Sequence, residues 1–498
     1  MKIHPRLPVL LFCGAVLGSA AACDDDSKPR PDADGDVLTD PADTPDVFPD
    51  TDAGEDGDPP VEDTPDADAG EDVEEEDGPP ASPFPVRVSD DGRTLVDSAG
   101  RPFLMHGEAA WSIIVQLTLE ETDLYAADRQ ARGINVAMVN LIEHHFCDDP
   151  PRNAAGDDPF LTPGDFGEPN EAYFAHADAV LERLRDAGIL VLLFPAYMGW
   201  GGGGEGWFVE MEALTAETCR AYGDWLGDRY GALDNIVWMA GGDYAPPTGS
   251  DGERCGLEIA AGLRERDPDA LHSTHWARNS TSLDLEAFHD YVDLDGVYTA
   301  ELTHGLCLEA RAADPGRPHY LIEAIYENEH DIQPPALRAQ AWWAVLTCGA
   351  GQLTGTTPIW PFSAGWEEAL DSTLSRQMVH LRALLEPRRW HLLDPDTDHT
   401  LVVSGYGGDT DLITAARTAD GLFALAYVPS TGTDARTFSV DMGAMAGAVT
   451  ARWFNPTDGS FADVEGSPFD DGAAHDLATP GDNGTGSNDW TLVLESSP

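Results

Sequence analysis

NIVWMAGGDYAPP, at residues 235–247, joins an apolar strand to two glycines and a carboxylate. An unbroken apolar run of this kind suits a parallel strand that is covered on both faces. In a (β/α)8 barrel, the groups that act on a ligand follow the C-terminal ends of the strands. A glycine pair at that point lets the backbone turn sharply and lets a ligand come close. The segment therefore predicts a barrel strand whose end presents Asp243 to a cleft.

Strand-like segments recur along residues 83–390 and alternate with helix-like segments at the spacing of βα units. The helix-like segments carry apolar residues at helical spacing and a glycine at the C-terminal end, as in 172–188. This pattern favours an α/β fold, a (β/α)8 TIM barrel, over the alternative of a doubly wound open sheet. The eight predicted strands are 103–108, 135–141, 189–195, 235–241, 270–276, 294–300, 319–324 and 350–355.

Residues 391–498 have a different pattern, in which short alternating strands are separated by turn residues. This pattern is typical of antiparallel sheets. We therefore expect a catalytic barrel domain at 83–390, followed by a small antiparallel β-sandwich domain.

Residues 1–23 have the pattern of an export signal. Lys2 and Arg6 precede an apolar run at 7–17, and small residues then lead to Cys23. This run is too short and too early in the chain for an ordinary membrane span. The segment LGSAAAC resembles a bacterial lipobox, in which Cys23 would be lipidated and become the mature N-terminus, and a plain secretory signal is the alternative. We expect an exported bacterial lipoprotein that a lipid anchor holds to a membrane, at the outer membrane or cell surface.

Residues 24–82 consist almost entirely of Asp, Glu, Pro, Gly, Ala and Thr. Such a segment cannot bury enough apolar area to offset its ordering entropy, so we expect a disordered acidic tether. The whole chain of 498 residues has a formal net charge of -62. Because like charges repel, nucleic acid is not an expected partner.

Five cysteines lie in the predicted folded part, so at least one thiol is unpaired or forms an intermolecular bond. An exported protein can hold disulfides, but the spacing leaves their connectivity open. No CxxC pair suggests zinc, and adjacent histidines such as His144 and His145 rarely converge on one ion. We therefore expect no metal and no other cofactor. The five cysteines are Cys147, Cys219, Cys255, Cys307 and Cys348.

A second carboxylate occupies a position equivalent to that of Asp243. Glu323 ends the seventh predicted strand, in RPHYLIEAIYENEH at 317–330. Strands four and seven face one another across a small barrel. Two facing carboxylates perform glycoside hydrolysis, in which one protonates the leaving oxygen while the other attacks the anomeric carbon or activates water. The alternatives are a helix N-cap for Asp243 and a surface charge for Glu323.

Other polar and aromatic residues follow the predicted strand ends. Carboxylates, amides and imidazoles hydrogen-bond to sugar hydroxyls, and indoles stack on sugar rings. Each of these side chains could instead close the top of the barrel. The candidate substrate-binding residues are Glu108, Trp111, Asn140, His144, Trp200, His275, Trp276, Glu301, Glu327 and Trp360.

Several motifs resemble, in order, the DUF4038, apiosidase-like family of glycoside hydrolases over 84–390: HGEAAWS, RGINVAMVN, NIVWMAGGD, YLIEAIYE and GAGQLTGTTPIW. The run WFNPTDGSF resembles the small domain, named for collagen binding, that commonly follows. The resemblance implies that Asp243 is the acid/base, that Glu323 is the nucleophile and that the substrate is an oligo- or polysaccharide of a plant or microbe. The family commonly has Asp where this chain has Glu108, which leaves the sugar open. We expect retention, although the separation of the two carboxylates decides between retention and inversion.

A hypothesis from a different class is a non-catalytic surface lipoprotein that binds collagen or a glycan through its C-terminal sandwich. The chain has no GxSxG, no HExxH and no phosphate-binding glycine loop, which weighs against an esterase, a metalloprotease and a nucleotide-binding protein. We favour the glycoside hydrolase. Binding of residues 391–498 to collagen and to polysaccharides, measured beside a sugar-release assay, separates the two hypotheses.

Overall fold

The structure is a computed structural model that describes residues 82–300 and 302–497. These residues lie in one compact unit. The predictions for the export signal, for Cys23 and for the tether up to residue 81 fall outside the described residues, as does the prediction for Glu301. In the described part of the chain, no helix has both the length and the apolar character that a membrane span needs.

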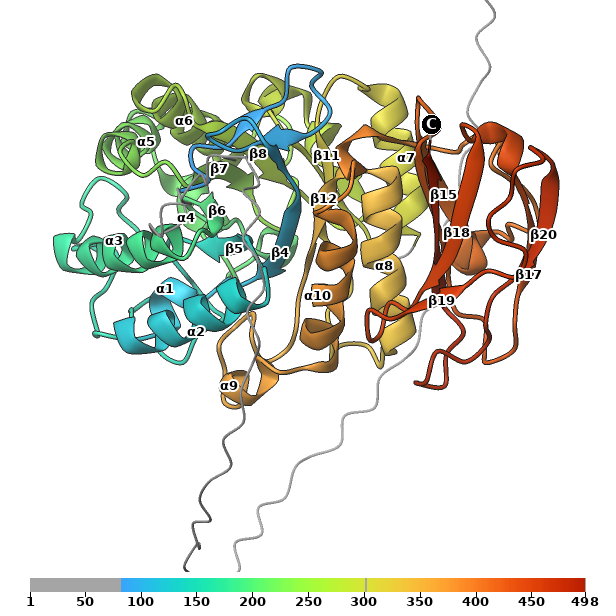
Figure 1. The fold of residues 1–498 in the computed structure, drawn as a ribbon. Helices are drawn as coiled ribbons and strands as arrows, with labels where there is room; N and C mark the ends of the chain where they lie inside the picture. Colours follow the sequence, from blue (N-terminus) through green and yellow to red (C-terminus); the bar gives the residue numbers. More distant parts are fainter. Residues whose placement is uncertain (1–81, 301, 498) are drawn as a thin grey trace, which may run out of the picture. The chain divides into compact units, whose positions relative to one another are not determined.

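Eight parallel strands form a barrel, as the sequence predicts. They pair in the order β8-β7-β6-β5-β4-β12-β11-β10, so the last barrel strand lies beside the first (Figure 1). The prediction of a barrel over an open sheet is confirmed. The strands are β4 (Met105–Ala109), β5 (Val136–Asn140), β6 (Leu190–Phe194), β7 (Ile236–Gly241), β8 (Leu271–His275), β10 (Asp295–Tyr298), β11 (His319–Glu323) and β12 (Gly349–Thr354).

The barrel is nearly closed, because β8 and β10 do not pair directly. The short strand β9 (Ser280–Thr281) pairs antiparallel with β10 at this seam. The hydroxyl of Ser282 then donates to the Thr274 carbonyl at 2.6 Å and accepts from the Gly296 N–H at 2.9 Å. Side-chain hydrogen bonds therefore bridge the two strands where a backbone ladder is missing.

Side chains along the barrel strands alternate between two apolar layers. In β6, Leu192 and Phe194 face the interior of the barrel, whereas Val191 and Leu193 face the helices. Burial on both faces explains the unbroken apolar run of such strands. The interior layer also takes residues from a three-stranded antiparallel sheet that precedes the barrel, made of β1 (Arg87–Val88), β2 (Leu95–Val96) and β3 (Pro102–Phe103).

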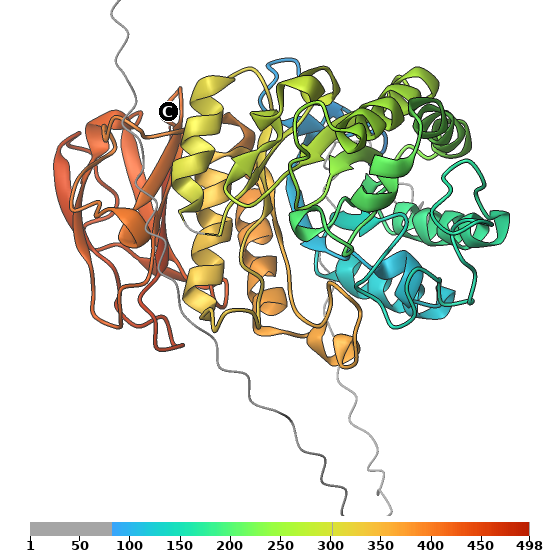
Figure 2. The same ribbon diagram turned by 180° about the vertical axis from the view of Figure 1, so that it is seen from behind.

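Helices cover the outside of the barrel, as the views from the two sides show (Figures 1 and 2). Helix α2 begins with a capping box, in which Thr118 accepts from the Glu121 N–H and Glu121 accepts from the Thr118 N–H. The long helices are α2 (Leu119–Ala131), α3 (Glu171–Asp186), α5 (Ala216–Tyr230), α6 (Asp251–Arg266), α7 (Thr303–Ala313), α8 (Pro334–Thr347) and α10 (Thr373–Leu385). The short helices are α1 (Ile113–Gln116), α4 (Phe208–Ala213) and α9 (Trp366–Ala369), and a 3-10 turn, η1, spans Trp200–Gly202.

Two disulfides join neighbouring helical segments. Cys219 in α5 is bonded to Cys255 in α6, and Cys307 in α7 is bonded to Cys348 at the end of α8. Cys147 is the free cysteine of the described residues. The prediction of at least one unpaired thiol agrees with this pairing.

The C-terminal part is an antiparallel β-sandwich, as predicted. A six-stranded sheet has the order β13-β15-β16-β21-β18-β19, and a three-stranded sheet has the order β14-β17-β20. Apolar side chains from both sheets form one core between them. The strands are β13 (Leu393–Pro395), β14 (Val402–Ser404), β15 (Thr414–Thr418), β16 (Phe423–Val428), β17 (Thr437–Asp441), β18 (Ala448–Phe454), β19 (Phe461–Asp463), β20 (Ala474–Ala478) and β21 (Trp490–Ser497).

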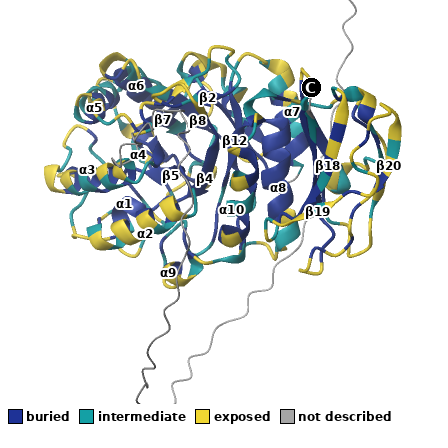
Figure 3. Cartoon of the chain, in the orientation of Figure 1, coloured by how far each residue is buried: buried dark blue, intermediate teal, exposed yellow. Residues whose placement is uncertain are grey.

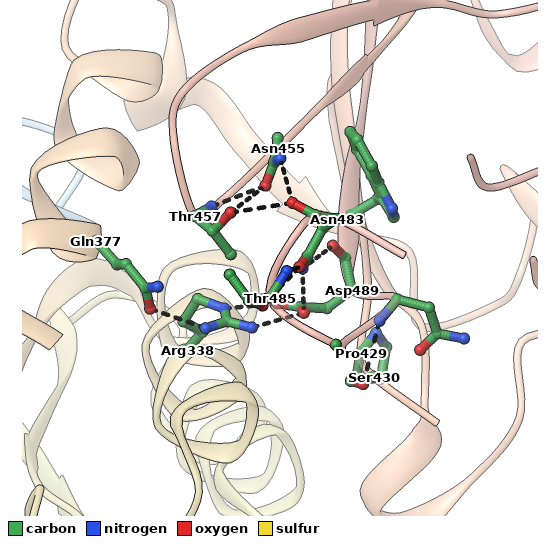
Figure 4. A network of polar contacts seen from close by, with 12 residues as sticks. Arg338, Gln377, Pro429, Ser430, Asn455, Thr457, Asn483, Thr485 and Asp489 are labelled. Atoms are coloured by element: carbon green, nitrogen blue, oxygen red, sulfur yellow. Dashed lines mark hydrogen bonds and ion pairs between the residues drawn. The ribbon is translucent and has the colours of Figure 1, made fainter. Parts of the chain in front are cut away.

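Helix α8 lies between the barrel and the sandwich and is buried along most of its length (Figure 3). Its Trp342 stacks on Tyr427 of β16, with the ring centroids 5.7 Å apart and the planes within 5°. Arg338, fully buried, donates two hydrogen bonds of 2.7 Å to the carboxylate of Asp489, which is also fully buried (Figure 4). The sandwich is therefore packed on the barrel through an apolar layer that contains one buried ion pair.

Candidate active site

The turn after β7 shows why two glycines precede Asp243. Gly241, Gly242 and Asp243 all have positive φ, at 89°, 109° and 52°. A Cβ at Gly241 would lie 2.3 Å from the carbonyl oxygen of His275, and a Cβ at Gly242 would lie 2.2 Å from the ring of Tyr197. Backbone conformation and close approach both require glycine here. The turn brings Asp243 to the C-terminal end of the barrel.

Asp243 is held by two neighbours. The Tyr197 hydroxyl donates to Asp243 Oδ2 at 2.8 Å. The backbone N–H of Asp243 donates to His275 Nδ1 at 3.2 Å. The second carboxylate oxygen, Oδ1, is buried and has no hydrogen-bond partner among the described residues. This oxygen is therefore available to a ligand.

Glu323 reaches the same place from β11 because the sheet is irregular there. Tyr298 of β10 pairs with Glu323, whereas the preceding residue, Val297, pairs with Leu321, so β11 carries one extra residue. Such a bulge re-aims the side chains that follow it. Glu323 is only 8% exposed, and it lines the same pocket as Asp243.

His275 connects the two carboxylates. Its Nδ1 accepts the Asp243 N–H, so in the neutral ring the proton is on Nε2. Nε2 lies 2.9 Å from Glu323 Oε2. Both ring nitrogens are thus directed at protein groups. One oxygen of each acid and one nitrogen of His275 lie within 4.8 Å of one another, a spacing at which these three groups could hold a metal ion.

Burial, and after it the charge of Asp243, raise the pKa of Glu323 to about 7, although hydrogen bonds from His275 and Tyr326 oppose this rise. The carboxyl group of Glu323 therefore gains or loses its proton near neutral pH.

The two carboxylates lie in a pocket of about 260 Å³ at the C-terminal ends of the barrel strands. Residues that end or follow all eight barrel strands line it. Six of them are predicted from the sequence: Trp111, Asn140, Trp200, Asp243, Glu323 and Trp360. His275 contacts both acids but does not itself line the pocket.

Four of the predicted substrate-binding residues do not line this pocket. Glu108 is buried on the outer side of β4, where it forms an ion pair with Arg129 at 3.1 Å. Glu327 accepts from the Leu374 N–H at 3.1 Å and joins its loop to α10.

The other two also serve the packing of loops. Trp276 is 1% exposed and donates to the Ser282 carbonyl at 3.1 Å. His144 Nε2 lies 3.1 Å from Glu210 Oε1 of α4. Position after a strand end places a residue on the right face of the barrel but does not say which way its side chain turns.

Sequence reasoning missed seven lining residues. Most are aromatic or charged side chains in the loops. The alternation of side chains along a strand does not extend into loops, so the sequence does not show which of these side chains point into the pocket. They are Phe146, Tyr197, Glu205, Arg278, Tyr298, Tyr326 and Glu329.

Two solved structures share this architecture. One, described as a glycoside hydrolase, has a TM-score of 0.72 and 22% identity, and the match covers 84% of this chain and 98% of that one. A glycoside hydrolase family 5 protein from Bacteroides vulgatus also has a TM-score of 0.72 and 22% identity, with 82% and 93% covered. Comparison with curated proteins gives no match. The fold is thus the barrel fold found in glycoside hydrolases.

The family model described as "Apiosidase-like, catalytic domain" matches residues 89–391. This chain belongs to that apiosidase-like family. A second model, described as "Putative collagen-binding domain of a collagenase", matches residues 395–495.

Proposed function

We propose that this protein is a retaining glycoside hydrolase that removes a terminal sugar from a plant or microbial polysaccharide. The observation that carries the proposal is the pair of acids, because an oxygen of Asp243 and an oxygen of Glu323 lie within 4.8 Å of each other in one pocket. Retaining enzymes hold their carboxyl groups about 5–5.5 Å apart, and inverting enzymes about 6.5–9.5 Å apart to admit a water. A nearest oxygen–oxygen distance within 4.8 Å is short enough for the retaining arrangement.

The contacts of each acid support its role. Hydrogen bonds from His275 and Tyr326 favour the charged form of Glu323, which suits a nucleophile. As the acid/base, Asp243 gives a proton to the leaving oxygen through Oδ1, which has no hydrogen-bond partner among the described residues. Glu323 attacks the anomeric carbon as the glycosidic bond breaks. In the second step Asp243 takes a proton from water, which releases the sugar from Glu323.

The pocket favours action on a chain end. Its volume of about 260 Å³ is near the lower limit of about 300 Å³ for ligand pockets. Side chains from all eight strand ends ring it, whereas cleavage inside a polymer needs a groove that is open at two ends.

A panel of plant and bacterial glycans tests the proposal. We expect stepwise release of single sugars, and the first anomer seen by proton NMR should have the configuration of the substrate. Release of internal fragments, or of the inverted anomer, contradicts the mode of action. Failure to release sugar from any glycan or synthetic glycoside contradicts the enzyme class.

The activity is expected to fall as pH falls through about 7. Because burial and the charge of Asp243 raise the pKa of Glu323 to about 7, its carboxyl group is protonated below this pH and cannot attack the anomeric carbon. The measurement is kcat/KM against pH. Asp243→Asn removes the neighbouring charge, so the ionisation of Glu323 should move to lower pH with a 2,4-dinitrophenyl glycoside. An ionisation that stays at the same pH contradicts the coupling.

Gly242→Ala is expected to lower kcat/KM by about 10²-fold, the effect of a displacement of about 1 Å at a reacting group. The new Cβ would lie 2.2 Å from the Tyr197 ring, which must move and release Asp243. Gly249→Ala is the matched control, because Gly249 also has positive φ, at 77°, but no atom within 4 Å of the added Cβ. Equal losses in the two variants would show that backbone strain, not the displacement of Tyr197, is the cause.

A further inference from the structure

The pocket has a side that adjoins the nucleophile and a side that adjoins the acid/base. On the first side, Trp111 Nε1 donates to the Tyr326 hydroxyl at 3.2 Å, and Tyr326 hydrogen-bonds to Glu323. A sugar attacked by Glu323 therefore contacts these aromatic side chains. The leaving group departs on the other side, next to Asp243.

A glycine-rich loop at 199–206 borders the side of Asp243. The N–H of Met198, just before the loop, donates at 3.0 Å to the first carbonyl of the Asp243 turn. At the neck of the loop, a Cβ at Gly206 would lie 2.4 Å from the nitrogen of Gly199. These contacts fix the base of the loop beside the acid/base.

The tip of the loop carries Trp200, which lines the pocket and is 51% exposed. Arg278, from the loop after β8, lies over the indole, with its Cζ 5.5 Å from the ring centroid. A guanidinium over one face of an indole holds the ring by a cation–π contact. Because half of Trp200 is still exposed, the ring has surface left for contact with a ligand.

Arg278 has donors to spare. The guanidinium lies near the Tyr298 hydroxyl, where it opposes the rise that burial causes in the pKa of that group, and no carboxylate of the described residues lies within ion-pair distance, in a chain that has 90 acidic residues. A guanidinium has five N–H donors in a fixed plane. The remaining donors can reach the hydroxyls of a ligand in the pocket.

We infer that Trp200 and Arg278 form a leaving-group subsite that selects a sugar as the departing group. The indole stacks on the sugar ring, and the guanidinium donates hydrogen bonds to its hydroxyls. The inference rests on the proposed function, since it names the group that the same site releases. A simple alkyl or aryl leaving group would use only part of this subsite.

Transfer of the glycosyl group from the enzyme to added sugars tests the leaving-group subsite separately from the cleavage of the donor. A glycosyl fluoride serves as donor, because fluoride is too small to contact Trp200, and methyl glycosides of glucose, galactose, xylose and arabinose compete with water for the glycosyl-enzyme. We expect saturable transfer to at least one of these sugars and non-saturable transfer to methanol. In Trp200→Ala and in Arg278→Ala, the ratio of sugar transfer to hydrolysis should fall about tenfold, which corresponds to about 1.4 kcal/mol. Hydrolysis of the fluoride by the same variant is the reference for this ratio.

Phe461→Ala is the matched control, because Phe461 is a half-exposed ring on β19 of the sandwich. It should leave both transfer and hydrolysis unchanged. Unchanged sugar transfer in the Trp200 and Arg278 variants overturns the inference while the hydrolase remains. A wild-type protein that hydrolyses no glycosyl fluoride and no glycan overturns the proposed function instead.

Discussion

Glu323→Gln is expected to abolish hydrolysis with every leaving group, whereas Asp243→Asn is expected to spare the most reactive one. Without Glu323 no covalent intermediate forms, so the leaving group is irrelevant. Without Asp243 only protonation of the leaving oxygen is lost. We expect kcat/KM of Asp243→Asn to fall on the order of 10²–10⁴-fold with a disaccharide and far less with a 2,4-dinitrophenyl glycoside, whose leaving group needs no proton.

The control for this pair is Glu286→Gln, which changes an exposed carboxylate outside the pocket. It should keep full activity, and all three variants should keep the thermal melt of the wild type. A reversed pattern, in which Glu323→Gln still cleaves the dinitrophenyl glycoside and Asp243→Asn does not, would show that the two roles are exchanged. Substantial activity of both Asp243→Asn and Glu323→Gln on a disaccharide would refute the assignment of these two acids as the catalytic pair.

Arg338→Met is expected to lower the free energy of unfolding by about 3–5 kcal/mol, because it leaves a buried carboxylate without its cation. Asp489 is 0% exposed and, among the described residues, keeps the neutral side-chain donors Tyr427 and Asn483. The measurement is urea unfolding followed by tryptophan fluorescence. Because the ion pair joins α8 to the sandwich, we expect one cooperative transition in the wild type.

Arg376→Met is the matched control on the neighbouring helix α10. Its ion pair with Asp371 is exposed, with 53% and 63% of the side chains accessible, so its loss should cost at most about 1 kcal/mol. The double variant Arg338→Gln, Asp489→Asn restores neutral hydrogen bonding and should lose less than Arg338→Met alone. Equal losses for Arg338→Met and Arg376→Met would contradict a stabilising buried pair.

The sequence predicted the positions of the site residues on the barrel better than it predicted their contacts. Both proposed catalytic residues follow strands with a strong apolar pattern, so their place on the barrel could be inferred without contacts. Glu108 shows what alternation adds. Met105, Ala109 and Trp111 share one parity along the chain and face the barrel interior, whereas Glu108 has the other parity and faces the helices. Strict use of this period would have corrected the expectation for Glu108.

The remaining contacts depend on residues that are distant in the chain. Trp200 and Arg278 come into contact because the loops after β6 and β8 border the same pocket. Arg338 and Asp489 form an ion pair although 151 positions separate them in the chain. No local pattern marks such pairs, since loop side chains follow no period.

The amino-acid sequence alone determined the eight barrel strands, the sandwich that follows them and the strand ends at which Asp243 and Glu323 lie, because burial on two faces of a parallel sheet imposes a pattern on neighbouring residues. Only the tertiary structure decided that a bulge in β11 turns Glu323 into the pocket, that His275 lies between the two acids and that α8 is covered by the sandwich. Those outcomes depend on packing between segments far apart in the chain, which leaves no periodic trace in either segment.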